Sequence, residues 1–536
     1  MAQRQHPGTA VAELASPRYS CAAQPLDQAV LQAAYNRTQP FAVVAAAGAG
    51  VLDVVPGEPV CVRVVVPPRQ WDSVSGRRGR DAAELYHTIA TQPSLWDSIM
   101  LDAVGVYTGV NVPIRLQPAR HASMLGRDTV HVYEGELRAF DEGEFKLTGV
   151  LEYREAAWNY EEPVPPPLEY APEAIATWPG TRVRVMVPEA SAFHLQNYKQ
   201  LPFCNGLSEA GRWLPVATLP FSPQSQGLTV YSGRVWLPYG CRLRGYTYSS
   251  FLQCLDDSRP LSSRATGIYT IHWFGDTNTR RALKKITSLG DWCAGEAAQR
   301  TSCVCDDSGE VFLRFTGQNT VRDTLLELEE EFGGWSVREN GVSKGRSVPS
   351  PQARIYYHRW EGLTKYNGRR WQDTFQPSAM GDNPEANLVI ISLGNLDASF
   401  TPFLEFTRQL AELAQLIQDT YSDQHIILRT PQYFCCREPR GAPLRRVQRD
   451  RNRLYGEYTQ QVFEHRFGDR VHVWDVGAIV EALPVAERTA VSSCAVNTVP
   501  SEIVDIENQL LISGLCKDDK LDGGAERRLP AATELG

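Results

Sequence analysis

The sequence lacks an apolar run long enough to cross a membrane. Its first twenty residues contain no apolar core, so neither a signal peptide nor a membrane anchor is expected within the chain as it stands. The longest apolar stretch, Phe41 to Leu52, covers about twelve residues and is followed by Asp53. A bilayer span takes about 20 residues. We therefore interpret the stretch as a β-strand.

Positive charge is also scarce, because 54 Lys and Arg residues face 62 Asp and Glu residues, for a net charge of −8. Nucleic-acid binding usually requires a basic face. The one basic run, Arg445 to Arg453, is short and interleaved with other residues, and we interpret it as a solvated helix face. No nucleic-acid partner is expected.

Motifs for metals and phosphates are missing as well. The twelve cysteines include Cys303-Val-Cys305 and the neighbours Cys435-Cys436, but neither has the paired spacing of a zinc site. Disulfides or buried thiols are expected instead, and no metal is predicted. Gly275-Asp276-Thr277-Asn278 lacks the lysine and the spacing of a phosphate-binding loop. One sequon, Asn36-Arg37-Thr38, is compatible with secretion.

A chain of 536 residues, 43% of them hydrophobic, exceeds one core and predicts two globular domains. After an N-terminal tail (1–38), a β-sandwich is expected over 39–165. Cys61 to Val66 is β-branched, and His131 to Phe140 with Phe145 to Glu155 indicates a hairpin. The proline-rich run Glu161 to Pro172 cannot donate ladder hydrogen bonds, so the boundary falls there, with a linker over 166–195.

Strand and helix patterns alternate in the remainder, which we assign to one domain (196–518) and a C-terminal tail (519–536). The predicted strands are Ile268–Phe274, Asn387–Gly394, Gln424–Thr430 and Val471–Val476, and the predicted helices are Thr279–Leu289, Phe403–Tyr421, Tyr455–Phe467 and Glu502–Leu515. Such alternation predicts a parallel sheet covered on both faces, with function at the carboxyl ends of its strands. The acidic run Leu326 to Phe332 is interpreted as a solvated helix face. Buried core is expected for Trp236, Trp273, Trp360 and Trp371.

The sharpest candidate site is Gly275-Asp276-Thr277, between the first of these strands and its helix. A hydroxyl at such a turn stands above the sheet, and N–H groups that begin the helix can stabilise an oxyanion. The alternative is a helix cap, since Asp276, Thr277 and Asn278 are all good caps.

Two further strand ends carry polar residues. Ser392 to Asp397 contains Gly394 and Asn395, whose N–H and amide can complete an oxyanion hole, or which simply form a turn. Asp475 ends the last strand, where a carboxylate can orient a base. His472, three residues earlier, is interpreted as a half-buried strand residue rather than a base.

Taken in order, these segments resemble the neurexophilin and PC-esterase domain (NXPE) family of the SGNH/GDSL superfamily over most of the chain. The resemblance lies in Trp236–Cys241, Cys254-Leu-Asp-Asp, His272–Arg281, Ile390–Phe403, Ile426–Thr430, Val471–Asp475 and Ile506–Cys516. It implies an α/β SGNH domain with a flavodoxin-like, mostly parallel sheet and helices on both faces, preceded by an Ig/filamin-like β-sandwich.

The resemblance also implies acyl transfer to, or ester hydrolysis from, carbohydrate hydroxyls, commonly of acetyl groups, in the secretory pathway, the Golgi or outside the cell. A carbohydrate or glycoconjugate would be the substrate, with an acyl donor such as acetyl-CoA or an acetyl ester and no other cofactor. By position, Thr277 stands for the family's acylated serine. The oxyanion hole and substrate contacts would fall on Gly275, Arg280, Gly394, Asn395 and Asp397.

Two departures from the family pattern bear on activity. Threonine replaces serine, and its β-methyl restricts χ1, although its hydroxyl can still attack. The family's histidine aligns with Asn497, which cannot take a proton, and losing a general base removes about 10²–10⁴-fold of rate. No histidine follows His472. Either His472, His358 or His272 serves as base, or the fold is kept for glycan binding without turnover.

Overall fold

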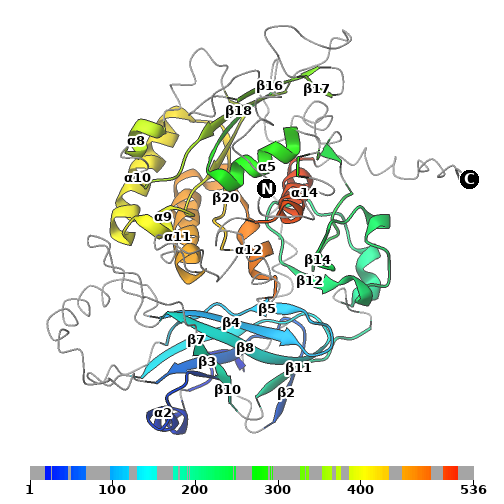
Figure 1. Cartoon of the computed structure of the whole chain (residues 1–536), viewed down its shortest axis with the longest axis vertical. Coiled ribbons are helices and arrows are strands. Elements are labelled where there is room, and N and C mark those ends of the chain that lie inside the picture. The colour runs from blue at the N-terminus through cyan, green and yellow to red at the C-terminus, as the bar shows by residue number, and fades with distance from the viewer. Residues whose placement is uncertain are drawn as a thin grey trace, which may run out of the picture.

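The protein consists of a β-sandwich and an α/β domain stacked on it (Figure 1). The computed structural model describes residues 19–25, 27–45, 50–67, 97–119, 130–153, 173–178, 181–189, 191, 194–245, 247–248, 269–287, 290, 292–293, 326–331, 334–336, 353–364, 370–375, 386–433, 449–484 and 499–516. Within these residues no helix is both long and apolar enough to cross a bilayer.

Two sheets form the sandwich. The first has the order β10 (Ala176–Thr177), β1 (Phe41–Val44), β3 (Val60–Val66), β7 (His131–Leu137) and β6 (Gln117–Pro118); the second has β2 (Val51–Val54), β11 (Arg182–Val185), β8 (Gly143–Tyr153), β4 (Ser98–Gly105) and β5 (Asn111–Pro113), with β9 (Glu173–Ala174) paired to β8. Their apolar faces share one core, which includes Val62 and Val64 from β3 and Leu101 and Phe145 from the second sheet.

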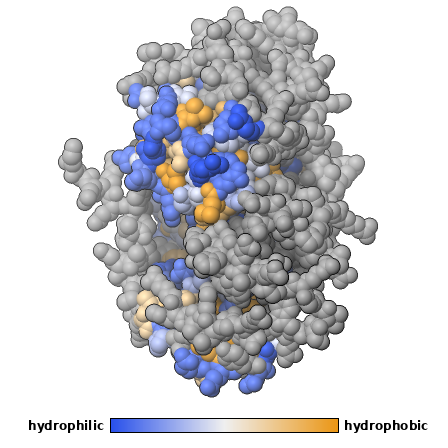
Figure 2. Space-filling view, turned by 90° about the vertical axis from the view of Figure 1, so that its left-hand side faces the viewer, coloured by the Kyte–Doolittle hydropathy of each residue, from blue (hydrophilic) through white to orange (hydrophobic). Residues whose placement is uncertain are grey.

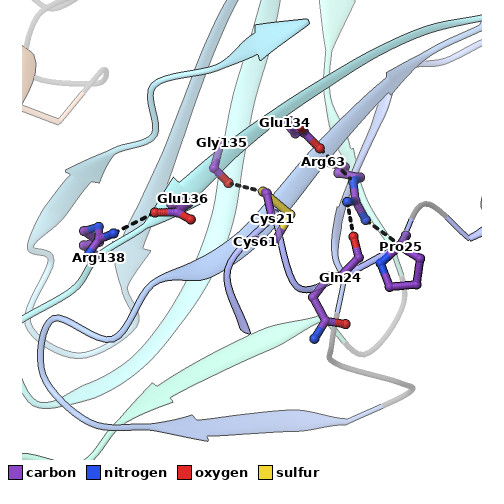
Figure 3. The surroundings of a disulfide bond; sticks show 9 residues. All are labelled: Cys21, Gln24, Pro25, Cys61, Arg63, Glu134, Gly135, Glu136 and Arg138. Atoms are coloured by element: carbon purple, nitrogen blue, oxygen red, sulfur yellow. Dashed lines mark hydrogen bonds and ion pairs between the residues drawn. A yellow bond between two sulfur atoms is a disulfide. The ribbon is translucent and has the colours of Figure 1, made fainter. Parts of the chain in front are cut away.

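Helix α2 (Gln28–Tyr35) packs on the first sheet through Val30 and Ala34. The segment before it is tied to β3 by the disulfide Cys21–Cys61 (Figure 3). Arg63, two residues along β3, donates to the carbonyls of Gln24 and Pro25. Asn36 of the sequon ends α2 and is exposed.

The structure corrects three expectations for this region. The predicted hairpin is wrong, because β7 pairs with β3 and β6 while β8 pairs with β4 and β11 in the other sheet. Residues 138–142 therefore cross between the sheets, which lets Leu137 and Phe145 face the same core. The apolar stretch from Phe41 contains two strands in different sheets, β1 and β2. Strands β9 to β11 belong to the sandwich, which extends into the region 166–195 expected to be a linker.

A seven-stranded sheet organises the second domain. Its order is β17 (Gly334–Ser336), β16 (Leu326–Glu331), β18 (Ala353–Arg359), β15 (Tyr269–Gly275), β19 (Leu388–Ser392), β20 (His425–Arg429) and β21 (Val471–Trp474). The last five are mutually parallel. By chain position these five run 2-1-3-4-5, the flavodoxin-like order, whose direction reverses between β15 and β19.

Helices cover both faces of this sheet, as predicted. On one face lie α5 (Thr277–Thr287), α12 (Val476–Glu481) and α14 (Ser501–Leu515), and on the other lie α8 (Trp371–Thr374), α9 (Asp397–Phe400), α10 (Phe403–Thr420) and α11 (Arg449–Phe467) (Figure 1). Alternate side chains of β15 point to opposite faces, so Trp273 packs in the core beneath α5 and α14 while Phe274 packs in the core beneath α10 and α11. A small sheet of β12 (Gly211–Pro215), β14 (Arg234–Pro238) and β13 (Val230–Tyr231), closed by the disulfide Cys204–Cys241, flanks this domain.

The outer side of α10 carries its polar residues. Figure 2 shows that face as largely hydrophilic with separate hydrophobic spots, and Leu404 on α10 is 61% exposed. Phe406, Leu410 and Leu413 point the other way and are fully buried, as the helical spacing predicts.

Two charged runs were interpreted wrongly as solvated helix faces. Leu326–Glu331 is strand β16, paired antiparallel with β18, and its Leu-Glu-Leu-Glu start has the period of a strand. In the basic run, α11 begins at Arg449, and Arg449 to Asn452 are buried. Arg449 and Asp450 contact β4 of the sandwich, whereas Asn452 contacts Gln432 of the α/β domain. The four tryptophans expected in the core, Trp236, Trp273, Trp360 and Trp371, are all buried.

Candidate functional site

The carboxyl ends of β15 and β19 meet where the strand order reverses, the place where open α/β sheets bind ligands. Asp276 follows β15, and Asn395 lies in the loop after β19. The Asn395 Nδ2 donates to the Asp276 Oδ2 at 2.5 Å. The structure therefore brings together two of the predicted site residues across the two strand ends.

Asp276 also caps α5. Its Oδ1 accepts from the backbone N and the Oγ1 of Thr279, each at 3.2 Å, and its carbonyl accepts from the N–H of the buried Arg280 at 3.0 Å. Thr277, the first residue of α5, is half-buried. Its hydroxyl makes no hydrogen bond within the described residues. Asp276 is thus both a helix cap and a candidate site residue, because its Oδ1 bonds to α5 and its Oδ2 bonds to Asn395.

Gly275 is required by the tightness of this turn. A Cβ there would lie 2.4 Å from the Thr279 Oγ1. The Gly275 carbonyl accepts from the N of Trp360 at 2.9 Å and the Oη of Tyr357 at 3.0 Å, which fixes the turn against β18.

Asp397 closes the loop after β19. Gly394 has φ 111°, and its N–H donates to the Asp397 Oδ2 at 2.8 Å. Burial raises the pKa of the Asp397 carboxyl to about 7, although N–H groups of Gly394, Leu363 and Thr364 lower it. The charge of Asp276 raises it further. In this state the Gly394 N–H is engaged by Asp397 rather than offered to a substrate.

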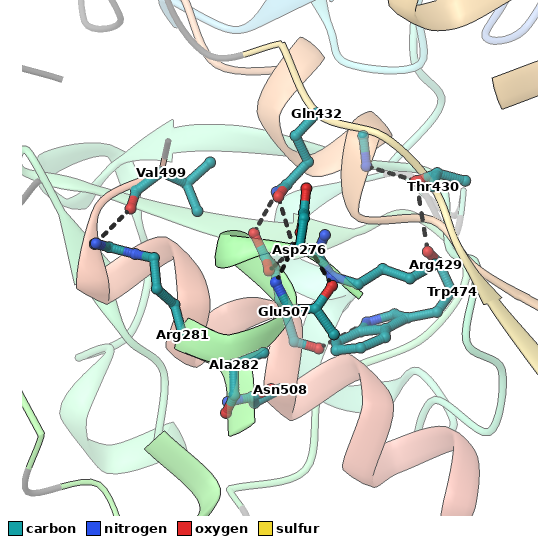
Figure 4. Close-up of polar contacts among 12 residues, drawn as sticks. Asp276, Arg281, Ala282, Arg429, Thr430, Gln432, Trp474, Val499, Glu507 and Asn508 are labelled. Atoms are coloured by element: carbon teal, nitrogen blue, oxygen red, sulfur yellow. Dashed lines mark hydrogen bonds and ion pairs between the residues drawn. The ribbon is translucent and has the colours of Figure 1, made fainter. Parts of the chain in front are cut away.

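Behind Asn395 lies a buried network that the sequence did not reveal. The Asn395 Oδ1 accepts from the backbone N of Gln432 at 2.7 Å. The Gln432 side chain donates to Glu507 of α14, and the Arg429 Nη2 donates to Glu507 at 2.8 Å. Figure 4 shows Asp276, Arg429, Gln432 and Glu507 gathered between the strand ends and α14. Gln432 lies three residues after Arg429, the last residue of β20, so its position just beyond a strand end was the signal that could have found it.

The Arg429–Glu507 ion pair is fully buried. Burial raises the pKa of Glu507, and the neighbouring Arg429 cation lowers it. The Arg429 guanidinium also lies over the Trp474 ring, 5.3 Å from its centroid. Its charge is balanced by Glu507 alone among the described ion pairs.

Asp475 lies at the same edge of the sheet but serves a different helix. Its Oδ1 accepts from the N of Ala478 and from the Thr430 Oγ1, both at 3.1 Å, so it caps α12. Burial raises the pKa of the Asp475 carboxyl, while Arg115 of the sandwich lowers it. Its hydrogen bonds do not reach Asp276 or Asn395.

Two of the three candidate histidines, His272 and His472, make their contacts away from Thr277. His272 is buried in β15, and its Nδ1 lies 2.8 Å from the Tyr421 Oη. The His472 Nε2 lies 3.0 Å from the His425 Nδ1 on β20, and His472 is half-buried as expected. Neither is brought to Thr277 by these contacts. His358 of β18 pairs in register with Phe274, three residues before Thr277.

Asn497 lies outside the described residues. Val499, two residues later, is held against α5 because the Arg281 Nη2 donates to its carbonyl at 2.9 Å. Cys303, Cys305, Cys435 and Cys436 also lie outside the described residues.

Two groups of potential metal ligands occur in the part of the chain that the structure describes, Cys21 with Cys61 and Glu134, and Cys204 with Glu209 and Cys241. Both cysteines of each group are joined in a disulfide, so neither group offers a thiolate. The donor sets do not fit a metal.

No protein-family model and no curated protein matches the chain. Among solved structures, it is similar to a protein assigned as an arylesterase from Agrobacterium tumefaciens str. C58, with 13% identity, a TM-score of 0.26 and coverage of 46% of this chain and 97% of that one. A peptidoglycan O-acetylesterase matches with 11% identity, a TM-score of 0.25 and coverage of 52% and 95%. The fold is defined by the strand order of the seven-stranded sheet.

Proposed function

We propose that the α/β domain is an SGNH-type acyl-ester site that moves an acyl group, most simply acetyl, to or from a carbohydrate hydroxyl through Thr277. The hydrogen bond between Asn395 and Asp276 carries this proposal, because it joins the two strand ends beside the Thr277 hydroxyl, which has no hydrogen-bond partner among the residues that the structure describes. The sequence resemblance to the NXPE family supports the choice of carbohydrate esters.

In the proposed reaction, the Thr277 Oγ attacks the acyl carbonyl and its proton passes to a base. The ester C–O bond then breaks, the leaving alcohol takes a proton, and the acyl group stays on Thr277. Water or a sugar hydroxyl attacks in turn and restores the threonine. N–H groups in the first turn of α5 and the Asn395 side-chain amide are suited to the oxyanion. His358 is the remaining candidate base, since the contacts of His272 with Tyr421 and of His472 with His425 engage the other two histidines.

A second candidate is glycan binding without turnover. It is favoured by the contacts of His272 with Tyr421 and of His472 with His425, which engage two of the three candidate bases away from Thr277. Asn497 at the position of the family's histidine also favours it.

The test compares the wild type with Thr277→Ala and Thr277→Ser. We expect the wild type to hydrolyse 4-nitrophenyl acetate and to react with a fluorophosphonate probe at Thr277, as located by mass spectrometry. The alanine variant should lose both activities, and the serine variant should gain, because it lacks the β-methyl that crowds the attack. No adduct in either hydroxyl-bearing protein, together with equal hydrolysis by the alanine variant, would reject the enzyme in favour of the binding protein.

Disulfides persist in oxidising compartments. The pairs Cys21–Cys61 and Cys204–Cys241 therefore support a protein of the secretory pathway or the cell exterior, where glycan substrates occur.

A further inference from the structure

The sandwich touches the chain directly beside the site. Glu152 of β8 accepts a hydrogen bond from the Tyr433 Oη at 2.5 Å and one from the Ser98 Oγ at 2.8 Å. Both Glu152 and Tyr433 are buried, 4% and 5% exposed. Tyr433 is the residue after Gln432, whose N–H holds Asn395.

The sandwich also supports Gln432 by a second route, through the first turn of α11. The N–H of Ile99 on β4 donates to the Asp450 Oδ2 at 3.2 Å, and Asp102 of β4 pairs with Arg449 at 3.4 Å. These contacts fix the first turn of α11. In that turn the Asn452 Nδ2 donates to the Gln432 carbonyl at 2.7 Å.

Gln432 is therefore held from both sides by elements that rest on the sandwich, and its N–H decides how the Asn395 amide is turned. An amide whose oxygen accepts from that N–H must present its NH₂ in another direction. In this structure the NH₂ faces Asp276.

We propose that the sandwich is a positioning element of the site: Glu152 and Tyr433 hold Gln432 so that Asn395 faces Asp276 beside Thr277. The inference rests on the proposed function, in that a reaction at Thr277 is what the positioning serves. Under this proposal the two domains form one functional unit, since the Glu152 carboxylate of the sandwich fixes the segment that orients Asn395 in the α/β domain. Displacing a reacting group by about 1 Å can cost about 10²-fold in rate.

The same interface supplies a matched control. Arg115 of the sandwich pairs with Glu457 at 3.4 Å and Glu481 at 3.5 Å, and its side chain is half-exposed. Arg115→Gln thus removes both of these ion pairs between the domains without changing a contact of Gln432.

The experiment measures the second-order rate of fluorophosphonate labelling of the full chain, well below the melting temperature of each variant. We expect Tyr433→Phe to label about 10-fold or more slowly. Glu152→Gln should slow labelling less, because glutamine can still accept from Tyr433. The double variant should match Tyr433→Phe, since both changes break one contact. Arg115→Gln should stay within about twofold of the wild type. An unchanged rate in Tyr433→Phe, or an equal loss in Arg115→Gln, overturns the proposal.

If the wild type does not label, the function proposed for Thr277 fails, and hydrogen exchange then decides the positioning role. Faster exchange of the backbone amides of residues 392–400 in Tyr433→Phe, but not in Arg115→Gln, supports it. The same exchange in all three proteins rejects it.

Discussion

Two strand ends at the carboxyl edge of the α/β sheet, those of β15 and β21, repeat one local design with different results. At each, an aspartate follows a strand and caps the next helix, Asp276 for α5 and Asp475 for α12. The residue after Asp276 is a half-buried hydroxyl, whereas the residue after Asp475 is the fully buried Val476. The second oxygen of Asp276 bonds to an amide from the neighbouring strand's loop, while the Asp475 Oδ1 takes both its helix N–H and the Thr430 hydroxyl. A capping aspartate alone therefore does not mark a candidate site. The hydroxyl that follows it and the amide from the neighbouring loop distinguish Asp276 from Asp475.

The largest effect should come from the buried Arg429–Glu507 ion pair, which also holds Gln432 beside the switch-point end, the carboxyl end of β15 where the strand order reverses. Glu507→Gln leaves the Arg429 cation buried without its carboxylate, and breaking a buried pair costs about 3–5 kcal/mol. Arg429→Met combined with Glu507→Gln should recover part of that loss, because no lone charge remains. Urea unfolding of the three proteins measures it. A loss below about 1 kcal/mol in the single variant would mean that Arg429 finds another partner.

Asn395→Leu tests whether the amide is what distinguishes the two ends. It removes the donor to Asp276 and, under the proposed mechanism, a donor to the oxyanion, which is worth about 10²–10³-fold in rate. Thr430→Val is the matched control at the β21 end, because it removes a hydroxyl that bonds to Asp475. Ester hydrolysis by the two variants is compared with the wild type. Equal losses would show that the two ends do not differ in function.

Asp397 gives the switch-point end a pH dependence. Its pKa is raised from 3.8 to about 7 by burial, so between these values the folded protein holds a proton that the unfolded chain has lost. Its contribution to stability is complete below pH 3.8 and is lost as pH rises to about 7, with a slope of up to about 1.4 kcal/mol per pH unit. Asp397→Asn should remove this slope from urea unfolding measured between pH 4.5 and 8. A slope unchanged in the variant would assign it to other groups.

The sequence predicts the residues at the strand ends that form the site, but it does not predict the buried residues that hold them in place. Parallel strands end at one edge, so the polar residues after β15 and β19 had to meet, and Asp276 and Asn395 do. Glu507 sits in α14 among buried residues on every side, so no periodicity marks it as part of a site. Gln432 follows Pro431, in a segment that the sequence predicts only as a loop.

Long-range contacts explain the other failures. The strands β7 and β8 have the pattern of partners, but only the competing strands β3 and β4, far away in sequence, decide that each joins a different sheet. Similarly, Arg449 and Asp450 have the sequence of a surface segment, and only β4, about 350 residues earlier in the chain, accounts for their contacts with the sandwich.

The smallest effect should come from Asp475→Ala, at the β21 strand end, where Val476 takes the place that Thr277 has after Asp276. Losing an N-cap costs about 1 kcal/mol, and the Thr430 hydroxyl also loses a partner. Hydrolysis and probe labelling at Thr277 should nevertheless stay near the wild-type rates, because the hydrogen bonds of Asp475 go to α12 and β20. Thermal unfolding and labelling are measured on the same samples. A strong loss of labelling with little loss of stability would make Asp475 a participant in the reaction and erase the difference between the two ends.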